Sequence, residues 1–117
     1  RCGYMKGGDA VLSQLLHRLG LSPNAVGFWY ILSAIEVMRQ DTRAVSCLTK
    51  RVYTAVAETY SVSSGAVESG LRHAVSACWK GNRSLLEEVV GVTLPARPTV
   101  GRFLAALLMH LETDGSF

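Results

Sequence analysis

Apolar and polar positions between residues 48 and 79 alternate in a way that predicts two helices joined by a tight turn. In the first helix Val52, Val56 and Ala57 recur at i, i+4 and i+5, so one side is apolar. In the second helix the apolar residues share one face at a period of 3.6 residues; they are Val67, Leu71, Ala74, Val75 and Cys78. Two short amphipathic helices in this order have the pattern of a helix-turn-helix.

The turn between these helices reads YSVSS over residues 60–64. Val62 is its lone apolar residue, and we expect it to pack between the two helices. Ser63 is the predicted N-cap, because its hydroxyl oxygen can accept a hydrogen bond from an amide that the second helix leaves unpaired. A capping box would need Glu or Gln at position 66, where the chain has Ala66.

The same periodicity predicts four further helices and no strand. The expected fold is therefore all-α, a compact bundle of about six helices that contains the helix-turn-helix. The additional helices are expected at residues 9–18, 25–39, 83–90 and 100–111. Asp9 and Thr99 are the predicted caps of the first and last of these, and Gly20 is expected to end the first. The helix at 25–39 is apolar on most sides and should be central, with Trp29 and Tyr30 in core packing rather than in a ligand pocket.

Polar connections separate these elements. Lys80 and Gly81 are expected to close the second helix of the pair, because a cation suits the negative end of the helix dipole and glycine suits a left-handed cap. Residues 40–46 are expected to be a polar connection and residues 114–117 a tail.

Length and composition indicate one domain. The 117 residues are enough for a single core, with residues 1–8 expected to be a linker remnant and residues 9–117 the helix-turn-helix domain. Hydrophobic residues make up 49% of the chain, yet the longest apolar run, at 103–109, is far shorter than the roughly 20 residues of a membrane span. No signal peptide is visible, so we expect a cytoplasmic protein without a membrane partner.

Catalysis and metal binding have little support in the sequence. The three cysteines are widely spaced and lack a metal-binding pattern; they are Cys2, Cys47 and Cys78. Cys78 is expected in the core, and the adjacent Glu87 and Glu88 diverge on a helix. No phosphate-binding loop accompanies these groups, so we expect no enzyme activity, catalytic site, cofactor or metal. His17 and His110 are expected to be half-buried helix residues.

The face of the second helix opposite its apolar side is polar and short-chained, as a helix lying in the major groove of DNA needs to be. The chain has a net charge of +3. Residues 43–83 carry six Lys or Arg against two Glu, and six minus two gives an excess of +4 that suits DNA phosphates. The predicted recognition helix runs from about residue 64 to residue 79.

The candidate DNA-binding residues divide by expected role. Ser63 and Ser64 are expected to hold a phosphate at the helix start, where unpaired amides and the helix dipole favour an anion. The residues expected to face base edges or to line that face are Gly65, Ala66, Glu68 and Ser69. Glu68 can accept a hydrogen bond from the amino group of cytosine. The expected phosphate contacts are Lys50, Arg51, Arg72, His73 and Lys80.

The chain resembles the DNA-binding effector domain of the sporulation initiation response regulator, the stage-zero sporulation protein A family. The most specific segments are LRHAV at 71–75 and W-x-G-N at 79–82. Further similar segments are Leu48-Thr49-Lys50, Gly27-Phe28 and Arg97-Pro98-Thr99. The resemblance covers about residues 9–112.

The resemblance implies a six-helix domain that binds double-stranded promoter DNA as a head-to-tail homodimer on tandem short sites. It also implies a receiver domain upstream in the full-length chain, whose phosphorylation releases dimerisation and DNA binding. The expected location is then the bacterial cytoplasm, on the nucleoid.

The chain departs from the family at its recognition helix. The family carries two base-reading arginines there, one on each side of a glutamate; here Glu68 is present, but the matching positions are Ala66 and Ser69. Each bidentate arginine–guanine contact is worth roughly 1–3 kcal/mol of discrimination. Two interpretations follow: a regulator that reads a different DNA sequence, or a degenerate helix-turn-helix that binds a protein partner and has little specific DNA binding.

Overall fold

The computed structural model of the protein describes residues 7–40 and 51–113, and within these ranges it contains six helices and no strand. The helices are α1 (Gly7–Arg18), α2 (Val26–Gln40), α3 (Tyr53–Tyr60), α4 (Ser64–Gly81), α5 (Arg83–Val90) and α6 (Val100–Thr113). The predicted all-α bundle of about six helices is confirmed. No helix in the described ranges is long and apolar enough to cross a bilayer.

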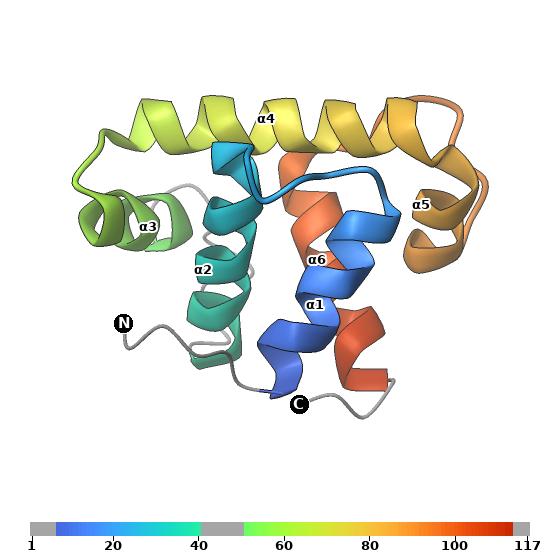
Figure 1. Ribbon diagram of the computed structural model, residues 1–117, viewed down its shortest axis with the longest axis horizontal. Helices are drawn as coiled ribbons and strands as arrows, with labels where there is room; N and C mark the ends of the chain where they lie inside the picture. Colours follow the sequence, from blue (N-terminus) through green and yellow to red (C-terminus); the bar gives the residue numbers. More distant parts are fainter. Residues whose placement is uncertain (1–6, 41–50, 114–117) are drawn as a thin grey trace.

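Helix α4 is the longest element and lies across one end of the bundle, with α1, α2 and α6 on one side of it only (Figure 1). Helices α3 and α5 lie near the two ends of α4. Helix α2 packs against α1, α3, α4 and α6, which confirms its predicted central place. One long side of α4 therefore remains on the surface of the molecule.

The predicted apolar faces form the core. Each of the eight residues assigned to the inner sides of the helix pair is at most 6% exposed: Val52, Val56, Ala57, Val67, Leu71, Ala74, Val75 and Cys78. Tyr30 is buried as expected, whereas the prediction for Trp29 is wrong, because its side chain is 41% exposed. The Trp29 indole Nε1 donates to the Pro23 carbonyl oxygen at 2.8 Å, so its polar edge is held in the loop before α2.

Local signals placed several helix ends correctly. Gly20 follows α1 in the left-handed region, with φ of 99°, and the Thr99 hydroxyl accepts from the Arg102 amide at 3.2 Å to cap α6. The prediction that Asp9 caps α1 is wrong, because the helix begins two residues earlier, at Gly7. Asp9 instead lies within the first turn of α1.

The predicted left-handed cap at Gly81 is also wrong. Helix α4 continues through Gly81, and among the described glycines only Gly20 and Gly91 have positive φ. A Cβ atom at Gly81 would lie 2.9 Å from the Leu19 carbonyl oxygen, so a side chain there would collide with the end of α1. Asn82 completes this junction by donating to the Arg18 carbonyl oxygen at 3.1 Å and accepting from the Leu85 amide at 3.2 Å.

Candidate nucleic-acid interface

Helices α3 and α4 are joined by residues 61–63, which lie within the turn predicted at residues 60–64. Ser61 adopts a left-handed conformation, with φ of 57° and ψ of 45°, and the Val62 amide donates to the Ala57 carbonyl oxygen at 3.0 Å. The expected packing of Val62 between the helices is wrong, because its side chain is 38% exposed. The buried side chains of Ala57 and Val67 lie in the core between the helices instead.

Ser63 caps α4 as predicted. Its hydroxyl oxygen accepts from the Ala66 amide at 3.1 Å, which satisfies one of the unpaired amides of the first turn. Ser64 is the first helical residue, and its side chain is exposed. Both serines therefore lie at the positive end of an 18-residue helix.

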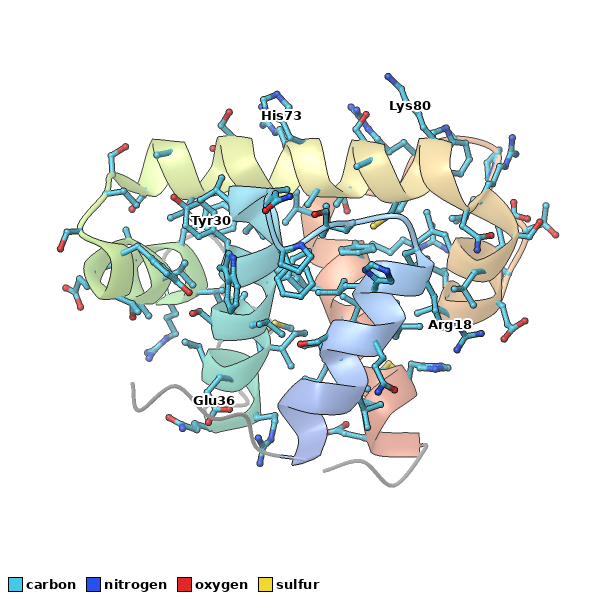
Figure 2. All side chains as sticks on the ribbon, in the orientation of Figure 1. Arg18, Tyr30, Glu36, His73 and Lys80 are labelled. Carbon is cyan, nitrogen blue, oxygen red and sulfur yellow. The ribbon has the colours of Figure 1, made fainter. Side chains whose placement is uncertain are left out.

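The side of α4 that faces away from the bundle, here called the outer face, matches the predicted polar face. It consists of Gly65, Ala66, Ser69, Arg72, His73, Ser76 and Lys80, which are exposed except for the partly buried Ser76. His73 and Lys80 extend from α4 away from the other helices (Figure 2). Short side chains thus occupy the first half of the outer face and basic side chains the second half.

Glu68 and Arg72 form an ion pair one helical turn apart at the edge of the outer face. The guanidinium NH2 group of Arg72 donates to a carboxylate oxygen of Glu68 at 2.6 Å, with 65% of the arginine side chain and 39% of the glutamate side chain exposed. The predicted roles treat these residues separately, whereas the structure brings them together. Burial raises the pKa of the neighbouring Tyr53 hydroxyl; Glu68 raises this pKa further and Arg72 lowers it.

A hollow of about 370 Å³ lies beside this ion pair, between α3, α4 and the segment that leads into α6. We call it the flank cleft; its lining residues are Tyr53, Glu68, Arg72, Val75 and residues 97–101. The candidate site residues predicted from the sequence do not include Tyr53 or Arg97. The segment Arg97-Pro98-Thr99 resembles the family in sequence. The pattern of apolar and polar residues around it does not predict that it lies beside α4.

The predicted basic region is only partly brought together. Arg51 is exposed just before α3, while Lys50 and Arg43 lie outside the described residues. The Arg83 side chain makes contacts within the domain. Its guanidinium lies 4.3 Å from the centre of the Trp79 ring, donates to the Leu94 carbonyl oxygen at 2.8 Å and pairs with Glu87 at 3.4 Å.

The groups considered for catalysis are dispersed. Cys78 is fully buried in the core as predicted, and burial raises the pKa of its thiol to about 12. His17 is exposed rather than half-buried, whereas His110 is partly buried. The described residues contain no cluster of His, Cys, Asp or Glu that could hold a metal ion.

The family model described as sporulation initiation factor Spo0A C terminal matches residues 12–111, from α1 to α6. The chain belongs to this family. The family comprises DNA-binding effector domains of sporulation response regulators. The matched range includes the whole α3–α4 pair, and the resemblance drawn from the sequence is therefore confirmed over nearly the whole chain.

Proposed function

We propose that this Spo0A C-terminal family domain is a sequence-specific DNA-binding transcriptional regulator that places α4 in the major groove. The carrying observation is the outer face of α4, which runs from Gly65 to Lys80 on the surface of the bundle and begins with short side chains. A helix presented in this way can approach base edges without steric obstruction from its own domain.

In this proposal the two halves of α4 have different tasks. The first turn, capped by Ser63, offers amides to a phosphate, and Ser69 approaches base edges together with Glu68. His73 and Lys80, in the second half, contact the sugar–phosphate backbone, and Lys50 and Arg51 do so ahead of α3. This division predicts that sequence preference and salt dependence depend on different residues.

Family membership supports two further proposals about assembly. Two copies bind head to tail on tandem short sites in promoter DNA, and the full-length chain carries a receiver domain before this domain. Phosphorylation of that receiver would then control pairing of the effector domains on DNA.

The test is selection of bound fragments from genomic DNA by the purified domain at two salt concentrations. An enriched sequence motif with affinity that falls steeply with salt supports the proposal. Lys80→Ala should weaken binding to all sequences alike and lower the salt slope, while Glu68→Ala should relax sequence preference. Gln14→Ala, an exposed change on α1 away from α4, is the matched control and should alter neither.

One observation favours the second function, a protein-interaction module. Four exposed hydrophobic side chains lie on α2, at the end of α3 and in the turn before α4: Val26, Trp29, Tyr60 and Val62. Tyr60 is tied to α2 by a hydrogen bond of 3.3 Å from its hydroxyl to the Trp29 carbonyl oxygen. Weak, sequence-blind binding that disappears at moderate salt would favour this function over the regulator, because apolar surface patches serve protein partners.

A further inference from the structure

Two basic side chains that are 25 positions apart in the sequence line the flank cleft. Arg72 reaches it from α4 and Arg97 from the segment that precedes α6. Arg97 is exposed, and it has no carboxylate partner among residues 7–40 and 51–113. The acidic side chain that lines the cleft is Glu68, which is already paired with Arg72.

We propose that the flank cleft seats a phosphate of the DNA backbone between Arg72 and Arg97, so that the segment before α6 is a second DNA contact. This inference rests on the proposed insertion of α4 into the major groove. It extends the interface beyond the helix pair, to a part of the chain more than fifteen residues past the end of α4.

The position of the cleft suits a backbone contact rather than a base contact. A helix in the major groove has a sugar–phosphate strand along each side, so residues at the edge of its outer face meet phosphates. Arg72 lies at that edge, on the side of α4 that carries Glu68 and faces residues 97–101. The opposite edge of α4 is occupied by its crossing with α2 at Gly70.

Arg72 can serve the phosphate while it keeps its ion pair. A guanidinium has five N–H donors in a planar fork, and a single NH2 group of Arg72 makes the hydrogen bond to Glu68. The remaining donors are available to a phosphate, and arginine is well suited to bidentate recognition of that group. One carboxylate oxygen of Glu68 fixes the direction of the fork, and the other oxygen remains for the base contact proposed above.

The segment that carries Arg97 is held at both ends. The Leu94 amide donates to Glu87 at 2.8 Å and the Leu94 carbonyl oxygen accepts from Arg83 at 2.8 Å. At the other end Pro98 is buried and Thr99 caps α6. Arg97 is therefore presented from a backbone that needs little ordering on binding, which lowers the entropic cost of the contact.

The test compares Arg97→Gln with Arg102→Gln in titrations of one duplex at several salt concentrations. The two changes remove the same charge from exposed side chains, but Arg102 lies with Ala105 and Met109 on a different surface of α6. Loss of one phosphate contact lowers the salt slope by about 0.9 and weakens binding about eightfold at 0.1 M salt. We expect this for Arg97→Gln and no change for Arg102→Gln.

The outcomes separate this inference from the function on which it rests. A wild-type domain that shows no salt-dependent DNA binding overturns the proposed function. Steep wild-type binding that Arg97→Gln leaves unchanged, or that both variants weaken equally, overturns the phosphate seat alone. Equal thermal unfolding of both variants confirms that any difference between them arises at the interface.

Discussion

Gly27 of α2 and Gly70 of α4 meet backbone to backbone where the two helices cross. A Cβ atom at Gly27 would lie 2.6 Å from the Gly70 carbonyl oxygen and 2.8 Å from the Cβ of Ala74. A Cβ atom at Gly70 would lie 2.8 Å from two ring carbons of Tyr30. The absence of a side chain at Gly70 permits this close crossing, and the crossing sets how α4 lies on the bundle.

Gly27→Ala should therefore destabilise the domain by about 1–3 kcal/mol, the usual cost of overpacking a tight contact. The atoms that the new methyl group meets are a backbone oxygen and a core side chain, neither of which can swing aside. Urea unfolding measures the change. Gly65→Ala is the control, because the nearest atom to its Cβ is the Ser63 hydroxyl oxygen at 3.9 Å; it should stabilise α4 by about 0.5–1 kcal/mol. Similar effects of the two substitutions would contradict the tight crossing.

Periodicity and cap chemistry predicted much of this fold because both act within a few residues of sequence. The inner face of α4, the Ser63 cap and the Thr99 cap each depend on neighbours no more than one or two turns away. The same holds for the short side chains of the outer face. These features follow from the sequence without knowledge of the tertiary structure.

Features that depend on contacts between distant residues could not be read in this way. The sequence predicts Gly81 as a helix cap. Glycine is needed there for another reason, because the backbone of Leu19, 62 positions earlier, leaves no room for a side chain. The flank cleft brings Arg72 and Arg97, 25 positions apart, to one hollow, where Glu68 pairs with Arg72. A single sequence gives the chemistry of these residues but not their distances, so the flank cleft could not be predicted from it.

Glu87→Ala should destabilise the domain by about 1.5–3 kcal/mol, the range for a hydrogen bond to a charged group. One carboxylate oxygen of Glu87 accepts from the Leu94 amide at 2.8 Å and also pairs with Arg83, so its loss frees the segment that leads to α6. Thermal unfolding provides the measurement. The neighbouring Glu88 is exposed, and Glu88→Ala should stay within about 0.5 kcal/mol of wild type. Comparable losses in the two variants would refute the special role of Glu87.

Stability should fall as pH rises above 9. Burial raises the pKa of the Cys78 thiol from its ordinary value of 9.0 to about 12 in the folded protein, because burial disfavours the thiolate. Between these values the native state retains a proton that the unfolded state has lost, so the stabilisation present below pH 9 is lost with increasing pH at up to about 1.4 kcal/mol per pH unit. The pKa of Tyr53 is also raised by burial, which adds a loss of the same sign above the ordinary tyrosine pKa of 10.0.

Urea unfolding of the wild type and Cys78→Ala between pH 8 and about 10 isolates the thiol, since Tyr53 contributes mainly at higher pH. The variant should be less stable at pH 8 because of the cavity that it creates, but its stability should decline less steeply. Parallel pH profiles would show that Cys78 does not titrate between the folded and unfolded states as its burial requires.

The double change Ala66→Arg with Ser69→Arg should restore binding to the DNA sites of the family. Both positions are exposed on the outer face of α4, where the resemblance assigns base-reading arginines, and an added side chain there meets solvent rather than the core. Each bidentate contact with guanine is worth roughly 1–3 kcal/mol of discrimination. The measurement is the ratio of affinities for a family site and for a duplex with those guanines replaced.

A charge-matched control separates base recognition from simple attraction. Gln14→Arg adds a positive charge on the exposed side of α1, and it should raise affinity for both duplexes equally if it acts at all. The α4 variant should raise the ratio by about tenfold or more, because arginine reads guanine through the geometry of its fork as well as through its charge. An unchanged ratio in the α4 variant would mean that this helix does not enter the major groove as proposed, and the exposed apolar surface near Val26 and Trp29 would become the better guide to function.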